Sequence, residues 1–261
     1  MKRSILLLLV LSFTLQLFSQ TKMIINKNNG TSDSLNLSDI KNITFKTSIS
    51  PIPINGLVAW YPFNGTVNDS SGYGNNGTNN GATPTTDRFG NAGKAYAFNG
   101  LTSYILIPNA SQLNNIDSIT LCCWVQSIDN GDKRLLTKGN ANQYQYGIPL
   151  TSGQVIAQAW TAGGGDALHA ASLLGNNNWH FVTAIVKSNT SAAIYVDGSL
   201  KSINTTIYGV WNKNGTGPLT IGAQYDGANN LSALLTGNLD DIRIYNRALN
   251  STEIQALYNE K

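Results

Sequence analysis

Short segments in which apolar and polar residues alternate run through most of this chain, and they constrain its fold more than any other feature. They recur about every eight to twelve residues and are separated by turns rich in Gly and Asn, as in sandwiches and jelly rolls. No run of about ten residues keeps a helical period before Ser251. The pattern predicts an all-β protein, a two-sheet antiparallel jelly-roll sandwich over residues 56–261 with a short C-terminal helix.

The first and last strands of this sandwich are expected to lie side by side, and residues 64–83 and 225–232 are expected to be loops. The expected strands cover residues 57–63, 94–98, 104–107, 118–126, 134–138, 144–148, 154–160, 168–173, 179–186, 192–196, 200–203, 218–222 and 239–245.

The closing segment, residues 237–257, reads GNLDDIRIYNRALNSTEIQAL and predicts a strand, a turn and a helix. Strict alternation places Asp240, Ile242 and Ile244 on one face of the strand and the other residues from 239 to 245 on the opposite face. An ionised carboxylate is costly to bury, so at least one of the two Asp side chains needs a cation, an Arg or several N–H donors. The helix is expected from Ser251, with Glu253 in its first turn.

Four blocks of the sequence resemble the laminin-G-like jelly rolls of the concanavalin A-like lectin/glucanase superfamily. They cover residues 56–78, 118–126, 179–201 and 237–258, in the order that the family shows. The closing block carries the family pattern of Gly, an apolar residue, Asp, a second acidic residue and an Ile-Arg-Ile-Tyr run. The resemblance implies the fold far better than it implies a function.

The Gly-rich stretch 64–83 has three readings: a disordered segment, a plain long loop or a cation-binding loop. Asp69 is its single carboxylate, and the glycines would let backbone carbonyls turn toward an ion. In relatives, the Asp-Ser-Ser-Gly loop and the first Asp of the closing strand lie near each other around calcium. The resemblance therefore implies a structural calcium ion held by Asp69 and Asp240, with oxygens from Gly72 to Asn76 completing the shell.

Residues 1–19 predict a secretory signal, because Lys2 and Arg3 precede an apolar run over 5–17. A membrane anchor is the alternative, but the run is shorter than the ~20 residues that a spanning helix needs. Cleavage is expected near Ser19. The chain is therefore expected to be secreted, to the extracellular space, the periplasm or the cell surface, with no later transmembrane segment.

A small β segment is expected over residues 20–46, with a hairpin turning at Asn29-Gly30 and a further extended piece behind it. It resembles a short N-terminal segment of exported proteins from Bacteroidetes-type bacteria. Residues 47–55, with Pro51 and Pro53, predict an extended linker to the jelly roll.

Bulk composition excludes some partners and a disulfide framework. Lys plus Arg number 17 against 14 Asp plus Glu, and no basic cluster appears, so nucleic acid is not an expected partner. Cys122 and Cys123 are adjacent in a strand pattern, so their side chains are expected on opposite faces without a disulfide.

Catalysis is not expected from the carboxylates that the sequence offers. The glucanases of the superfamily share a Glu-x-Asp-x-x-Glu motif, whereas Glu253 and Glu260 are the only glutamates here and both fall in the terminal helix. A hydrolase would need two facing carboxylates, and a lyase a base such as His169 or His180. The expected function is a secreted, non-catalytic binding module; a polysaccharide hydrolase or lyase and a purely structural domain are the alternatives.

Aromatic side chains near loops are the candidate ligand contacts, because a sugar ring stacks on an aromatic face. Trp160, Trp211 and Tyr225 are the candidates, although Trp and Tyr also pack in cores. The expected partner is a polysaccharide or glycoconjugate, or a surface protein.

Overall fold

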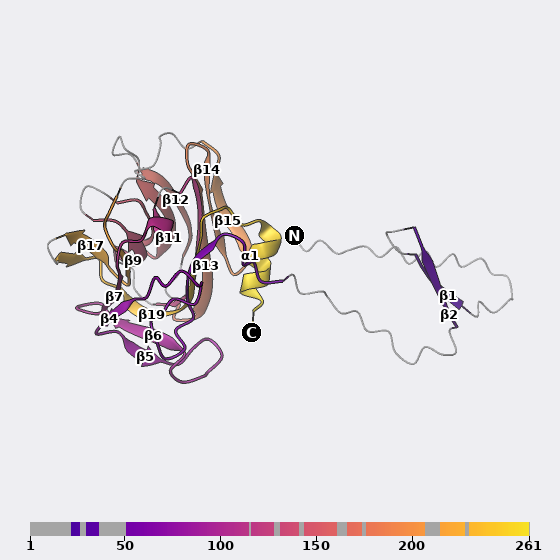
Figure 1. Cartoon of the computed structure of the whole chain (residues 1–261), viewed down its shortest axis with the longest axis horizontal. Coiled ribbons are helices and arrows are strands. Elements are labelled where there is room, and N and C mark those ends of the chain that lie inside the picture. The colour runs from indigo at the N-terminus through magenta and orange to yellow at the C-terminus, as the bar shows by residue number, and fades with distance from the viewer. Residues whose placement is uncertain are drawn as a thin grey trace. The chain divides into compact units, whose positions relative to one another are not determined.

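The computed structural model describes residues 22–26, 30–36, 51–114, 116–127, 131–140, 144–160, 166–173, 176–206, 215–227 and 230–260 (Figure 1). The chain divides into two compact units, Met1–Ser48 and Ile49–Lys261. The expected signal, residues 1–19, lies outside the described residues. Among those described, no helix has both the length and the apolar character required to cross a membrane.

The first unit contains an antiparallel hairpin of β1 (Lys22–Asn26) and β2 (Ser32–Asn36). Met23 pairs with Leu35 across it, and Ile24 is exposed. The expected hairpin is present, while its Asn29 and the extended piece behind it lie outside the described residues.

The second unit consists of two antiparallel sheets. The seven-stranded sheet has the order β12 (Asp166–Leu173), β11 (Gln154–Trp160), β10 (Tyr146–Thr151), β9 (Lys133–Lys138), β16 (Leu219–Ile221), β7 (Tyr104–Ile107) and β4 (Thr78–Asn80). The eight-stranded sheet has the order β15 (Ser199–Asn204), β14 (Ser191–Val196), β13 (Trp179–Lys187), β8 (Ser118–Gln126), β19 (Thr236–Tyr245), β6 (Ala95–Asn99) and β5 (Thr83–Thr85), and β3 (Leu57–Tyr61) pairs with β19. The first and last strands of the sandwich are therefore adjacent, as predicted.

Alternation along β8 shows how the sequence builds the core. Leu121, Cys123 and Val125 belong to the main hydrophobic core, whereas Cys122 and Trp124 belong to a second cluster. Because neighbouring strand residues point to opposite faces, the two free cysteines are separated by the sheet, as predicted.

The second cluster lies beneath the C-terminal helix α1 (Ser251–Tyr258), which packs Ile254 and Leu257 onto the eight-stranded sheet (Figure 1). The helix begins where it was expected, and Asn250 is its N-cap. The Asn250 side chain accepts from the backbone N–H of Glu253, whose carboxylate accepts from the N–H of Asn250. This capping box satisfies donors that the first turn leaves free.

Two segments expected to be loops contain strands. The Gly-rich stretch holds β4 and β5, and the polar stretch after β16 holds a hairpin of β17 (Gln224–Gly227) and β18 (Asn230–Ser232). These strands are short and polar, so they lack the apolar alternation by which a strand is recognised. A 3₁₀ turn, η2 (Ser111–Leu113), was also not predicted.

Candidate functional site

An aromatic and polar surface forms where the end of β11 meets the β17–β18 hairpin. The ring centroids of Tyr144 and Trp160 lie 5.0 Å apart, with the planes tilted by 39°. The Tyr144 hydroxyl donates to Asp226 and lies 3.4 Å from the carbonyl oxygen of Tyr225. We call these residues, with Gln224 and Arg134, the Tyr144 patch.

Strand register brings the two rings together. Tyr146 in β10 pairs with Ala159 in β11, so the residues just before β10 run beside the end of β11. The backbone N–H of Trp160 donates to the carbonyl of Gln145 at 3.0 Å, which continues this pairing and fixes Tyr144 near the indole. Both rings are partly exposed.

Hydrogen bonds and charge fix the polar half of the patch. Partial burial acts to raise the pKa of Asp226, but hydrogen bonds from Ser232, Tyr144 and Gln224 outweigh it and lower that pKa. Arg134 donates from Nε to Oε1 of Gln224 at 2.8 Å and forms an ion pair with Asp132. The patch thus places two partly exposed aromatic side chains beside an ionised carboxylate and an amide, with the buried Arg134 guanidinium bonded to that amide, and aromatic rings beside carboxylates and amides are the chemistry that holds hydroxyl-rich ligands.

Of the three aromatic residues predicted as ligand contacts, Trp160 contributes its ring to the patch, and Tyr225 contributes its backbone carbonyl. Trp211 lies outside the described residues. Tyr144 and Asp226 were missed. The signal that could have revealed Asp226 is its place beside Tyr225, but nothing in the sequence relates either residue to Tyr144.

The closing strand corrects a prediction about the acidic pair. Across β8, Asp240 pairs with Trp124 and Arg243 with Cys122, so two residues of β19 stand opposite one residue of β8. Asp241 has a φ of 46°, and this bulge shifts the alternation by one residue. Asp240 therefore does not share the face of Ile242 and Ile244, and the two carboxylates do not point to opposite sides.

Arg88 lies between the two carboxylates. Its guanidinium is 2.5 Å from Asp240 and 3.8 Å from Asp241, and it sits 4.7 Å from the centroid of the Trp124 ring. Burial raises the pKa of Asp240 to about 7, although Arg88 opposes the rise. The sequence predicted that a buried Asp would need a cation, an Arg or several N–H donors, and for Asp240 the partner is Arg88.

Asp241 has two further partners. Trp60 donates from its indole nitrogen at 2.7 Å, and Arg243 lies 3.2 Å away. Arg243 also contacts Glu260, at 2.6 Å, and stacks over the Trp60 ring at 4.6 Å. A connected set of ion pairs thus extends from Arg88, in the loop before β6, to Glu260, just after α1.

Asp69 anchors the Gly-rich stretch. Its Oδ1 accepts from the backbone N–H groups of Trp60 and Ser71 at 2.9 and 2.8 Å. Its Oδ2 accepts from the hydroxyl of Ser71 at 2.8 Å and the N–H of Asn75 at 2.9 Å. One of these four hydrogen bonds ties the loop to β3, and the other three, from Ser71 and Asn75, hold the loop together.

These contacts bear on the predicted calcium ion. The loop and the closing strand do meet, since Asp69 binds the backbone of Trp60 and Asp241 binds its side chain. However, N–H and O–H donors occupy both oxygens of Asp69, Arg88 occupies Asp240, and the Asn76 side chain accepts from the N–H of Asp69. This arrangement does not fit a cation shared by Asp69 and Asp240, and among the described residues no group of three or more His, Cys, Asp or Glu side chains is placed to hold a metal.

Replacing Asp69 with Asn is expected to lower the free energy of unfolding by about 2–3 kcal/mol, because an amide NH₂ would face N–H donors. The loss should be the same in a chelator and in millimolar calcium, measured by urea unfolding. Asp132, whose carboxylate is 60% exposed, gives the matched control Asp132→Asn, which should change little. A loss seen in calcium but not in the chelator would instead support the predicted ion.

Comparisons with known proteins agree with this fold. A family model described as the concanavalin A-like lectin/glucanases superfamily, of the laminin G type, matches residues 98–255, which is more than half of the chain. Adhesion G-protein coupled receptor V1 of Danio rerio is 27% identical over 179 residues, which are 64% of this chain and 3% of that receptor.

Two solved structures share the architecture. The binding domain of Paraclostridial Mosquitocidal Protein 1 superposes with a TM-score of 0.65 and 20% identity, over 78% of this chain and 52% of that domain. Domain 4 of an extracellular arabinanase from Geobacillus stearothermophilus, solved with arabinotriose, gives a TM-score of 0.60 and 19% identity, over 78% of this chain and 98% of that domain. The chain belongs to the laminin G-type family of the concanavalin A-like lectin/glucanases superfamily, as its four sequence blocks predicted.

Proposed function

We propose that the protein is a secreted, non-catalytic binding module that holds carbohydrate on the Tyr144 patch. The observation that carries this proposal is the Tyr144–Trp160 ring pair beside Asp226 and Gln224. A pyranose or furanose ring has an apolar face that packs on an aromatic ring and hydroxyls that bond to carboxylates and amides. The likeness to an arabinanase domain solved with arabinotriose supports the same ligand class.

The carboxylate of the patch favours binding over hydrolysis. A general acid for glycoside cleavage needs a raised pKa, whereas the pKa of Asp226 is lowered. The only glutamates are engaged elsewhere, since Glu253 forms an ion pair with Arg247 and Glu260 with Arg243. We therefore assign Asp226 the role of a hydrogen-bond acceptor for ligand hydroxyls.

Replacing Trp160 with Ala is expected to weaken binding to the best glycan of an array by about tenfold or more, since aromatic anchors dominate such interfaces. Asp226→Asn removes the charge of the acceptor and should also weaken binding, but less than Trp160→Ala does, because the shape of the side chain is kept. The control is Tyr73→Ala, which removes an aromatic side chain that is 56% exposed outside the patch. Glycan affinity measured by calorimetry that is equal in all three variants would contradict the proposal.

Two other results would redirect the assignment. New reducing ends, or unsaturated ends absorbing in the ultraviolet, after incubation with neutral and uronate polysaccharides would show an enzyme. Retention on a surface protein with no glycan binding would show that the partner is protein. Export and the calcium ion stay predictions; sequencing the N-terminus of the secreted chain for a start near residue 20 tests the first.

A further inference from the structure

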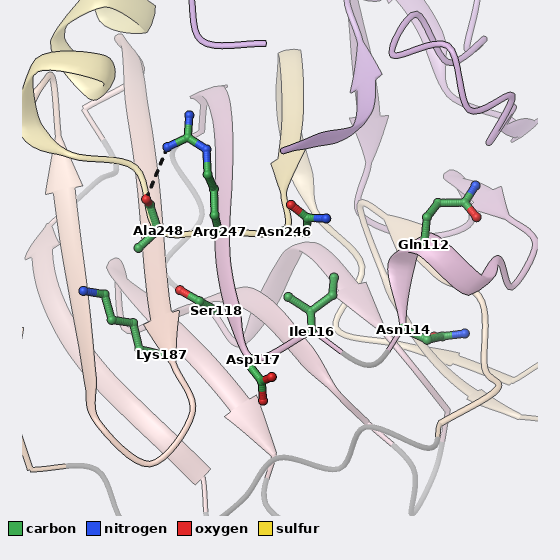
Figure 2. Close-up of a pocket in the computed structure, with 9 residues that line it drawn as sticks. All are labelled: Gln112, Asn114, Ile116, Asp117, Ser118, Lys187, Asn246, Arg247 and Ala248. Carbon is green, nitrogen blue, oxygen red and sulfur yellow. Dashed lines mark hydrogen bonds between the residues drawn. The ribbon is translucent and has the colours of Figure 1, made fainter. Parts of the chain in front are cut away.

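A second concave surface opens on the other sheet, between the start of β8, the end of β13 and the segment that follows β19 (Figure 2). The pocket has a volume of about 600 Å³. Its walls are mostly polar, and Ile116 is an apolar contact within it. None of its lining residues belongs to the Tyr144 patch. Lys187 and Ser118 face each other across the β8–β13 pair and form one wall.

The orientation of the Asn114 amide follows from its neighbours. Lys138 is fully buried, and its ammonium, which can only donate, bonds to Oδ1 of Asn109 at 2.9 Å. Asn114 then donates from Nδ2 to the same oxygen at 2.9 Å. Its own Oδ1 is left as an acceptor beside the pocket, shielded from solvent and without a hydrogen-bond partner among the described residues.

Gln112 is oriented in the same way. Asn75 donates from Nδ2 to the carbonyl of Val58 at 2.9 Å, so its Oδ1 must accept, and Gln112 donates to it from Nε2 at 2.6 Å. The Gln112 oxygen is thereby turned to the other side, where the Ser111 hydroxyl approaches it at 3.3 Å. Two amides of the pocket thus present oxygens rather than N–H groups.

The charges of the pocket nearly cancel. The Arg247 guanidinium turns toward α1 (Figure 2), where both its terminal nitrogens bond to Glu253 at 2.7 and 3.0 Å. Asp117 and Lys187, both exposed, leave one charge of each sign. A strongly anionic or cationic ligand therefore gains little here.

The Ser118 hydroxyl is a second unpartnered group at the wall. Its Oγ is shielded from solvent and, like Oδ1 of Asn114, has no hydrogen-bond partner in the part of the chain that the structure describes. An unsatisfied buried polar group is destabilising, and a side-chain rotation toward a bound hydroxyl would offset that cost. A hydroxyl suits both atoms because it donates to Asn114 and either donates to or accepts from Ser118.

We infer that this pocket binds a neutral saccharide unit through hydrogen bonds alone, as a second site separate from the Tyr144 patch. Sugar hydroxyls match its mixture of amide oxygens, the Asn246 amide, one ammonium and one hydroxyl. None of the described residues that line the pocket is aromatic, so it selects by hydroxyl pattern rather than by ring stacking.

The test uses the ¹⁵N-labelled chain carrying Trp160→Ala, titrated with D-glucose, D-galactose or L-arabinose. Saturable shifts are expected at the amides of Ile116, Ser118 and Asn246. Adding Ser118→Ala or Lys187→Met should weaken the affinity about two- to tenfold, the effect of one lost hydrogen bond. Ser199→Ala, on the exposed strand β15, is the matched control and should leave the affinity unchanged.

Three outcomes would overturn the inference. They are the absence of saturable pocket shifts with every sugar, shifts that Ser118→Ala and Lys187→Met leave unchanged, and binding of inorganic phosphate in place of sugar. The proposals for the two sites can be contradicted independently of each other. A loss of glycan binding with Trp160→Ala alone tests the patch, whereas pocket shifts that persist in that variant test the second site.

Discussion

Replacing Arg88 with Met is expected to lower the free energy of unfolding by about 3–5 kcal/mol, because it leaves a buried carboxylate without its partner. The Asp240 side chain is 4% exposed, and among the described residues Arg88 is the one cation that forms an ion pair with it. The variant also loses the contact of the guanidinium with the Trp124 ring. Urea unfolding followed by tryptophan fluorescence measures the change.

The double variant Arg88→Met/Asp240→Asn is the control for this result. Removing both charges also removes the desolvation cost, so the double variant should recover much of the lost stability. If it is as unstable as Arg88→Met alone, the loss comes from packing on Trp124 and Phe89 rather than from the carboxylate.

The same pair sets a pH dependence. The pKa of Asp240 is about 7 in the folded chain, against an ordinary value near 3.8. The folded state therefore binds a proton that the unfolded state does not, and stability from this group grows as pH falls from about 7 toward 4. In Arg88→Met the pKa of Asp240 in the folded state should be higher still. As the pH falls from about 8 to about 5, the free energy of unfolding of the variant should therefore rise relative to that of the wild type. If Arg88→Met loses the same free energy of unfolding at about pH 8 as at about pH 5, this expectation is wrong.

Truncating Ile254 and Leu257 to Ala is expected to cost about 2–5 kcal/mol for each residue. Both side chains are fully buried against the outer face of the eight-stranded sheet, near Trp124 and Phe181. The combined loss approaches the total stability of a typical domain, about 5–15 kcal/mol, so the double variant should unfold well below the wild-type temperature. Calorimetry gives the measurement.

Thr252→Ala is the matched control, because Thr252 is exposed on the same helix. It should stay within about 0.5 kcal/mol of the wild type. If the double truncation changes the stability as little as this control does, the helix contributes little to the stability of the fold. The burial of Ile254 and Leu257 would then not be what holds the helix on the sheet.

The sequence alone determined the architecture. Alternation depends on neighbouring residues and needs no tertiary information, so the limits of β7, β8 and β11 were predicted to the residue. The same holds for the opposite faces of Cys122 and Cys123. The β17–β18 hairpin was missed because strands that are short and polar carry no such local signal.

Only the tertiary structure decided where the functional groups meet. The bulge at Asp241 moves Asp240 away from the core face, and a bulge is a property of two paired strands, which alternation in one strand does not contain. Tyr144 and Asp226 meet because the register of β10 on β11 and the β17 hairpin bring distant segments together. Local periodicity fixes which face a residue takes, whereas long-range pairing fixes its neighbours, and the candidate site depends on neighbours.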